Sequence, residues 1–298
     1  MTSVRRTYES AFRSGLFAGE SHLVTGGGSG IGRCIAHELA SLGAKVVISG
    51  RKLDKLERVV AEIEELGGEA EAVAFDIRDE EAVVARVGEI VKRHGRLHGL
   101  VNNAGGQFPS PLLAISKKGF EAVVATNLTG GFLVSREVFL QSMQAHGGSI
   151  VNVVADMWNG MPGMGHSGAA RAGMVNLTKT AAYEWAPSAV RVNAVAPGYI
   201  ASSGMDTYEG PVRSLIQKLG DHVPLGRVGL EAEVSSVVCF LLSPAAAFVT
   251  GVTIPIDGGA PLGSALFPLK TDKPGPSFDA FPLKKRPEVL AEDDGEQP

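Results

Sequence analysis

The strongest constraint on the fold is an alternation of short apolar runs with longer amphipathic segments along most of the 298-residue chain. The apolar runs are rich in Val and Ile, and most are continuous rather than alternating with polar residues. Such runs are typical of parallel strands that are buried on both faces of a sheet. We predict strands at His22–Thr25, Lys45–Ser49, Glu71–Phe75, Gly99–Val101, Ser149–Val154, Val190–Ala196 and Thr253–Ile256.

The segments between these strands carry apolar residues at helical spacing. Asp79, for example, precedes a run in which Ala82, Val83 and Val87 recur as they do at the start of a helix. We predict helices at Ile31–Leu42, Leu53–Leu66, Glu80–Arg93, Gly119–Ala145, Ala172–Ala186 and Ala232–Leu242. Repeated strand–helix–strand units imply right-handed crossovers, so the sequence predicts an α/β fold with a doubly wound sheet.

Two segments fall outside this pattern. Residues 1–20 form an N-terminal extension to a domain that spans residues 21–260. Residues 261–298 are rich in Pro and contain the acidic run Glu292-Asp293-Asp294, a composition that cannot build a core of its own. We expect this C-terminal tail to be ordered only where it packs on something.

The composition excludes several classes of function. A net charge of −4 and a pI of about 6.0 give no general attraction to nucleic acid or to an anionic membrane. No apolar run reaches the roughly 18 residues needed to span a bilayer. The two cysteines, Cys34 and Cys239, are expected to be buried thiols in a reducing cytosol. Because neither a secretory signal nor a Ser-Lys-Leu terminus is present, we expect a cytoplasmic protein.

A glycine-rich turn, "LVTGGGSGIGR", joins the first predicted strand to the first long helix. Small residues let the backbone approach a pyrophosphate, and the N-terminus of the helix offers free N–H groups and a positive dipole end. The position of the turn at the start of a βαβ unit favours cofactor binding over a simple tight turn. The expected contacts are Gly26, Ser29, Gly30, Ile31 and Gly32.

The second predicted strand ends in "ISGRKLDK", where an Asp or Glu would bind the ribose of NAD. Arg51 and Lys52 stand there instead, and two cations suit the 2′-phosphate of NADP, although they are also compatible with a solvated helix start. Asp76 and Ile77 follow the third strand. Asp76 is equally suited to capping a turn and to bonding the adenine.

Four motifs at these spacings resemble the short-chain dehydrogenase/reductase family over about residues 18–260. They are "TGGGSGIG" at 25–32, "NNAGG" at 102–106, "VATNLTGGF" around Asn127 and "RVNAVAPGYI" at 191–200; "IPIDGG" at 254–259 fits the family's last strand. The resemblance implies a single Rossmann-type domain with a seven-stranded parallel sheet. It also implies a homo-oligomer, commonly a tetramer, that packs through two long helices.

The resemblance assigns further cofactor contacts at the ends of the central strands. Adenosine is expected near Asn103, Ala104 and Gly105, and the nicotinamide near Pro197, Gly198 and Ile200. Asn127 is expected to kink a long helix and to hold a water.

The chain departs from the family at the residues that transfer protons. The positions of the family's Ser, Tyr and Lys hold Val154, Ser167 and Arg171. Ser167 is too weak an acid to replace Tyr, and Arg171 does not release its proton at neutral pH. Arg171 can still donate hydrogen bonds to the nicotinamide ribose. A register shifted by one residue would pair His166 with Ala170 and lose the cation.

A subgroup of the family fits these residues better. The segments "GGQFPSP" at 105–111, "HGGSIVNVV" at 146–154 and "HSGAARAGMVNLTKT" at 166–180 resemble peroxisomal trans-2-enoyl-CoA reductase and the 2,4-dienoyl-CoA reductases. These enzymes add hydride to an activated C=C bond, so the charge appears on a thioester enolate, which requires hydrogen-bond donors. Ser167 and Asn127 would supply them. This subgroup can carry a catalytic Tyr at the position of Val175, so its mechanism does not transfer simply.

Other residues near the segment at 166–180 are each compatible with two interpretations. Asp156 is either a catalytic acid or the cap of a loop, and His166 points away from the face shared by Ser167 and Arg171. An apolar cluster lines an acyl pocket or belongs to the core. Its members are Met157, Trp158, Met161 and Met164.

Three functions follow, the first being an NADP(H)-dependent reductase of an enoyl thioester. The second is an alcohol or carbonyl oxidoreductase for another small molecule, such as an acyclic terpenoid, with Asp156 or His166 as the base. The third is a catalytically silent cofactor-binding protein, which turnover would distinguish from the other two. No metal site is expected.

Overall fold

The sheet is built from seven parallel strands in the order β3-β2-β1-β4-β5-β6-β9, which confirms the predicted α/β fold. The computed structural model describes residues 7–209, 211–262 and 273–290. The strand order reverses between β1 and β4, as in doubly wound folds. The strands are β1 (Ser21–Thr25), β2 (Lys45–Gly50), β3 (Glu69–Ala74), β4 (Gly99–Asn102), β5 (Gly148–Val153), β6 (Val190–Pro197) and β9 (Thr253–Ile256).

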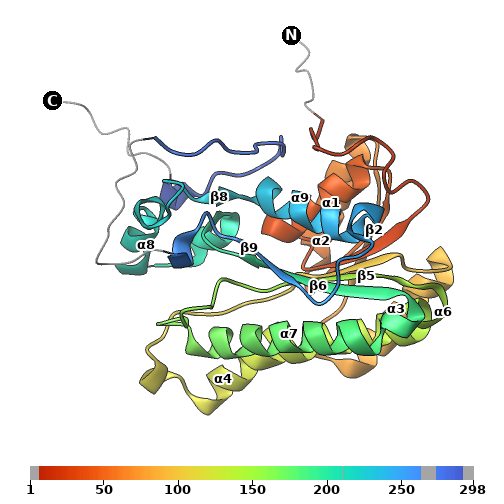
Figure 1. The fold of residues 1–298 in the computed structure, drawn as a ribbon, viewed down its shortest axis with the longest axis horizontal. Helices are drawn as coiled ribbons and strands as arrows, with labels where there is room; N and C mark the ends of the chain where they lie inside the picture. The colour runs from red at the N-terminus through yellow and green to blue at the C-terminus, as the bar shows by residue number, and fades with distance from the viewer. Residues whose placement is uncertain (1–6, 210, 263–272, 291–298) are drawn as a thin grey trace, which may run out of the picture.

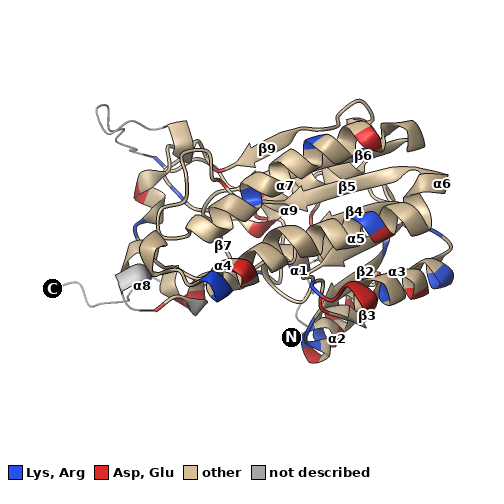
Figure 2. Cartoon of the chain, turned by 90° about the horizontal axis from the view of Figure 1, so that it is seen from below, with Lys and Arg blue, Asp and Glu red and all other residues tan. Residues whose placement is uncertain are grey.

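Helices cover both faces of the sheet (Figure 1). One layer consists of α1 (Gly30–Ser41), α2 (Leu53–Glu65) and α9 (Glu231–Leu242). The other layer includes α3 (Glu80–His94), α5 (Gly130–Val138) and α7 (Gly165–Glu184). Figure 2 shows charged residues of both signs spread over the outer helices, while the central strands between them carry few. The two cores therefore lie between the sheet and each helix layer.

The long helix predicted at Gly119–Ala145 is present but irregular. It begins with α4 (Lys117–Val124), passes through π-helical turns at Ala125–Thr129 and Phe139–Met143 that flank α5, and ends with α6 (Gln144–His146). The first π turn contains Asn127, where a kink was expected. A π turn displaces a side chain from the ordinary helical register and is frequent at functional sites.

Helix α7 begins at Gly165 rather than at the predicted Ala172. The prediction was late because glycines lower the propensity of "GHSGAARAG" for a helix. The structure gives two of these glycines a packing role. A Cβ on Gly168 would lie 3.2 Å from Met161, and a Cβ on Gly173 would lie 2.9 Å from Leu128. Tertiary packing thus favours helix where local propensity does not.

The chain between β6 and α9 holds short elements that the sequence did not reveal. Strand β7 (Ile200–Ala201) pairs in parallel with β8 (Gly229–Leu230), and the helix α8 (Pro211–Ile216) lies between them. Their lengths are below those at which periodicity can be recognised. This segment directly follows the carboxyl end of β6.

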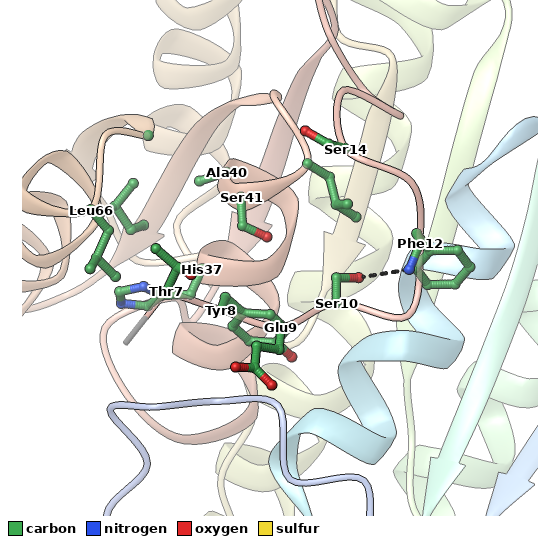
Figure 3. A pocket seen from close by; sticks show the side chains of 13 residues that line it. Thr7, Tyr8, Glu9, Ser10, Phe12, Ser14, His37, Ala40, Ser41 and Leu66 are labelled. Carbon is green, nitrogen blue, oxygen red and sulfur yellow. Dashed lines mark hydrogen bonds between the residues drawn. The ribbon is translucent and has the colours of Figure 1, made fainter. Parts of the chain in front are cut away.

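The N-terminal extension packs against α1. Phe17 is fully buried, and its N–H donates to the carbonyl oxygen of Leu42 at 3.0 Å. The Tyr8 hydroxyl donates to the buried carboxylate of Glu38 at 3.0 Å. A cavity of about 320 Å³ remains between the extension, α1 and the end of α2, with Ser10 on its wall (Figure 3).

The described part of the tail, residues 273–290, also packs on the domain. Phe281 is buried beside Tyr8, Cys34 and Ala232, and the Glu9 N–H donates to the carbonyl oxygen of Ala280 at 3.2 Å. The acidic run at residues 292–294 lies outside the described residues. Cys34 and Cys239 are buried free thiols, as predicted.

Among the described residues, no helix combines the length and hydropathy required to cross a membrane.

Phe281→Ala is expected to lower the free energy of unfolding by about 3 kcal/mol, because it removes a ring with 2% exposure that contacts His37 and Arg33. Urea unfolding followed by circular dichroism measures this change. Leu113→Ala is the control, since Leu113 is 96% exposed and its loss should change stability by less than about 0.5 kcal/mol. Equal effects of the two substitutions would contradict the packing of the tail.

Candidate active site

At two positions of the glycine-rich turn after β1, other backbone atoms lie so close that only glycine fits. Gly26 has φ +68°, and a Cβ on it would lie 2.9 Å from the Cα of Ala104. A Cβ on Gly32 would lie 2.5 Å from the carbonyl oxygen of Gly26. Ser29 is the N-cap of α1, and its side chain makes no capping hydrogen bond. The first N–H groups of α1, at Gly30 and Ile31, are therefore not capped by Ser29 and suit an anion.

Thr25 holds this turn against the end of β4. Its Oγ1 accepts the N–H groups of Asn103 and Ala104, both at 3.0 Å. The Asn103 side chain donates to the carbonyl oxygens of Thr25 and Gly26 at 3.0 and 3.3 Å. Asn103 thus joins the end of β4 to the glycine-rich turn through the backbone. Thr25 was not among the predicted contacts, although its place directly before the glycines is a signal that the sequence carries.

The cations expected at the 2′-phosphate lie at the end of β2. Arg51 and Lys52 are exposed, and within the described ranges neither has an ion-pair partner. The neighbouring Ser49 hydroxyl is buried without a hydrogen-bond partner in the described part of the chain.

Asp76 stabilises a turn. Its carboxylate accepts the backbone N–H of Arg78 at 3.0 Å and the guanidinium of Arg78 at 2.5 to 3.1 Å. These hydrogen bonds from Arg78 hold the pKa of Asp76 below its ordinary value, and the charge of Arg51 adds to the effect. Of the two interpretations of Asp76, the observed contacts are those of the turn. Ile77, the next residue, is buried against Gly130.

A chain of hydrogen-bonded polar side chains runs from the buried Asn127 and Ser167 to the exposed Gln107. Asn127 Nδ2 donates to Ser167 Oγ at 3.4 Å, and Ser167 Oγ donates to Gln107 Oε1 at 3.3 Å. Asn127 Oδ1 accepts the N–H of Gly106 at 2.9 Å. The structure thus brings together Asn127 and Ser167, which were predicted, with Gln107, which was not. Gln107 follows the "NNAGG" motif, and no pattern in the sequence marks it.

Arg171 is a buried cation without a carboxylate partner in the described structure. One guanidinium nitrogen, Nη1, donates to the carbonyl oxygen of Val153 at 2.8 Å, and Nε has no partner among the described residues. Burial lowers the pKa of Arg171 to about 10, so the group is still charged at neutral pH. Its Nη2 lies against Gly105. An uncompensated buried charge is costly, so this site favours a ligand with an electron-rich oxygen.

His166 is fully buried beside Ser167. Its Nδ1 accepts the N–H of Ser167 at 2.8 Å, so the hydrogen-bond pattern places a proton on Nε2. Nε2 has no partner among the described residues, and the ring packs edge-on against Phe108 at a centroid distance of 4.5 Å. The contacts of the His166 side chain are thus the backbone of Ser167 and the ring of Phe108.

The carboxyl ends of β5 and β6 meet at Asp156 and Pro197, where the Asp156 N–H donates to the Pro197 oxygen at 3.0 Å. Burial raises the pKa of the Asp156 carboxyl, the Trp158 N–H lowers it, and the charge of Asp257 raises it further. Asp156 therefore holds a loop and is also more easily protonated than an ordinary Asp.

Of the remaining predicted residues, some belong to the core and others are exposed. A Cβ on Gly198 would lie 2.8 Å from the Cα of Asp257, and Ile200 is buried. Val154 and Val175 belong to a core cluster, with Met157 packed against it. Trp158 is 44% exposed, so the methionines and Trp158 do not form one buried pocket wall.

Comparison with known proteins gives several matches. A family model described as Enoyl-(Acyl carrier protein) reductase matches residues 26–261. The chain is 37% identical over 262 residues to a peroxisomal 2,4-dienoyl-CoA reductase from Danio rerio, and the match covers 87% of each chain.

Solved structures agree with this match. A citronellol catabolism dehydrogenase from Pseudomonas aeruginosa PAO1 is 61% identical with a TM-score of 0.77, covering 85% of this chain and 99% of its own. A structure from Beutenbergia cavernae, assigned as an NAD(P) dependent gluconate 5-dehydrogenase, contains NADP at low occupancy. It is 34% identical with a TM-score of 0.76, covering 83% of this chain and 98% of its own. With its sheet topology and these matches, the protein belongs to the short-chain dehydrogenase/reductase family, whose members are oxidoreductases that bind NAD(P).

Proposed function

We propose that the protein is an NADPH-dependent reductase that acts on the C=C bond of an enoyl thioester. The observation that carries the proposal is the buried group of Asn127, Ser167 and Arg171. It offers fixed hydrogen-bond donors, but no side chain in it is an acid that can protonate an alkoxide at neutral pH. In this proposal the family's Ser, Tyr and Lys are replaced, and the reaction is one that does not require them.

The donors suit the charge that this reaction develops. When bound, NADPH supplies hydride to the β-carbon of the substrate. The π electrons of the C=C bond then move toward the thioester carbonyl, whose oxygen becomes an enolate oxygen. Ser167 Oγ–H would turn from Gln107 to that oxygen, while Asn127 Nδ2 keeps Ser167 in place, and such fixed donors stabilise the charge. Asp156 or a water then supplies the proton to the α-carbon.

The residues around the glycine-rich turn suit a nicotinamide dinucleotide. The backbone at Gly26 and Gly32, together with the N–H groups of α1 that the Ser29 side chain does not cap, would hold the pyrophosphate. Arg51 and Lys52 would hold a 2′-phosphate, and Arg171 the nicotinamide ribose. The other expected contacts, from Asn103 to Gly105 and from Pro197 to Ile200, line the same edge of the sheet. We further propose a cytoplasmic homotetramer with a small-molecule substrate.

A second candidate function is oxidation or reduction of an acyclic terpenoid alcohol or aldehyde. The 61% identity to a citronellol catabolism dehydrogenase favours it. This reaction requires a base or acid at the substrate oxygen, and the described site offers only Asp156 or His166 for that role. The geometry of the site therefore favours reduction of an enoyl thioester, whereas the similarity to the citronellol catabolism dehydrogenase favours a terpenoid substrate.

Absorbance of the nicotinamide distinguishes these reactions. Purified protein is mixed with NADPH and with short or long trans-2-enoyl-CoA, a dienoyl-CoA or a branched terpenoid aldehyde, and the matching alcohol is tested with NADP⁺. We expect NADPH oxidation with the enoyl thioesters alone. Turnover confined to the alcohol or aldehyde would replace the proposal with the second candidate, and bound cofactor without any turnover would indicate a silent protein.

NADPH is expected to bind at least ~100-fold more tightly than NADH, a difference of about 2.7 kcal/mol, if Arg51 and Lys52 hold the 2′-phosphate. Arg51→Ala should reduce that preference to less than ~10-fold because it removes one of the two cations. Titration calorimetry measures both constants. Arg58→Ala, on the exposed side of α2, is the control and should leave the preference unchanged. Equal affinities of the wild type for NADPH and NADH would contradict the assignment of Arg51 and Lys52 to the 2′-phosphate.

Gly105→Ala is expected to reduce kcat/KM at least ~10-fold, because the new Cβ would collide with Nη2 of Arg171 and move the guanidinium from its fixed place. Gly106→Ala is a matched control, since a Cβ on Gly106 meets no atom within 4 Å. Steady-state kinetics with the best substrate of the panel, together with thermal unfolding, tests the pair. Full activity of Gly105→Ala would show that the position of Arg171 is unimportant.

A further inference from the structure

A second cavity, of about 680 Å³, lies between the C-terminal tail and the domain. Small-molecule sites are typically about 300–1,000 Å³, so its size suits a ligand. The tail contributes Lys284, Lys285 and Arg286 to the lining, while Glu231 and Ala201 contribute from the domain. In Figure 1 the tail crosses over β8 and α9 toward the N-terminal extension.

The cations of this cavity are held in place from both sides. Before them, Phe281 is buried, and the guanidinium of Arg33 donates to the carbonyl oxygen of Leu283 at 3.0 Å. After them, Val289 is 1% exposed, and its N–H donates to the carboxylate of Asp206 at 3.0 Å. Anchors on both sides limit the backbone freedom of the cationic segment, so a ligand would not have to order it.

Two of the three cations are available to a ligand. Lys284 forms an ion pair with Asp279, another residue of the cavity. Lys285 and Arg286 are exposed and have no ion-pair partner within residues 7–209, 211–262 and 273–290. Arg carries a planar fork of donors that matches the oxygens of a phosphate.

The cavity lies next to the glycine-rich turn. Glu231 lines it, and Glu231 Oε1 lies 3.9 Å from the place where a Cβ on Gly30 would stand. Ser202 approaches the same place at 3.9 Å. Burial raises the pKa of Glu231 to about 7, so this carboxyl can take up a proton near neutrality instead of repelling an anion. Arg33 is the charged neighbour that opposes this increase.

We propose that this cavity binds the phosphate groups of a nucleotide ligand, with Lys285 and Arg286 as their partners. Two ligands of the proposed reaction carry such groups: the coenzyme A portion of a thioester and the dinucleotide cofactor. The coenzyme A case rests on the proposed function. In either case the tail belongs to the binding site.

The test compares the wild type with the double variant Lys285→Glu/Arg286→Glu in the full-length protein. Titration calorimetry measures binding of coenzyme A, adenosine 3′,5′-bisphosphate and NADPH at two salt concentrations. We expect the double variant to weaken at least one of these ligands ~10-fold or more and to flatten its salt dependence, because two charge-assisted contacts are reversed. If only coenzyme A and the bisphosphate bind more weakly, the ligand of the cavity is the coenzyme A portion of the thioester. If only NADPH binds more weakly, the ligand is the cofactor.

A control variant reverses two exposed cations that do not line the cavity, Arg58→Glu/Lys92→Glu. It changes net charge by the same amount and should alter the dissociation constants less than ~2-fold. Equal losses in both variants, or no loss in either, would overturn the inference. If the charge reversal perturbs the circular dichroism spectrum, the milder double variant Lys285→Ala/Arg286→Ala replaces it. That variant should lower the affinity for the same ligand.

The kinetics separate this inference from the proposed function. The same enoyl group is supplied on coenzyme A and on N-acetylcysteamine, which lacks the nucleotide. If the wild type reduces neither thioester, the proposed function is wrong, and the calorimetric binding data still test whether the cavity binds a phosphate ligand. If it reduces both, and the double variant raises KM for neither and weakens no ligand, the cavity inference alone is wrong.

Discussion

The geometry of the crevice depends on the contact between the ends of β1 and β4, where the strand order reverses. At such a point the helices that follow the two strands go to opposite faces of the sheet, and a crevice opens between them. Thr25 closes its base by accepting two N–H groups from the chain after β4. That contact brings the backbone of Gly26 against Ala104, next to the N-terminus of α1. The expected pyrophosphate site therefore follows from backbone geometry.

The charge of Arg171 limits the chemistry at the other end of the crevice. Within the described part of the chain its buried guanidinium has one carbonyl oxygen as its partner, an arrangement that costs free energy unless a ligand completes it. A guanidinium offers donors in a fixed plane and keeps its proton, whereas a Lys ammonium titrates more readily and is a flexible point charge. Ser167 and Arg171 both offer hydrogen-bond donors, and neither side chain readily gives up a proton at neutral pH, so in the proposed reaction they would stabilise charge on an oxygen without protonating it. An enolate oxygen needs only this stabilisation.

The sequence predicted the sheet well because buried parallel strands leave long apolar runs, and all seven were found within two residues of their observed starts. It also placed the glycine-rich turn, since backbone approach requires glycine there. It did not predict Gln107 or Thr25, because neither belongs to a periodic pattern and each acts through a partner distant in sequence. The early start of α7 was missed for the same reason: Gly168 and Gly173 fit against Met161 and Leu128, which only the folded chain brings to them.

The two ends of the chain were predicted to lie outside the core, and their composition explains why neither forms a core alone. They nevertheless meet on α1, where Tyr8 and Phe281 pack together at a ring-centroid distance of 5.7 Å. The inner side of α1 faces the sheet and α9, so the extension and the tail cover surface that would otherwise be open. A helix supported from both sides can tilt little. Because the N-terminus of α1 carries the glycine-rich turn, these terminal segments help to fix the place where a phosphate would bind.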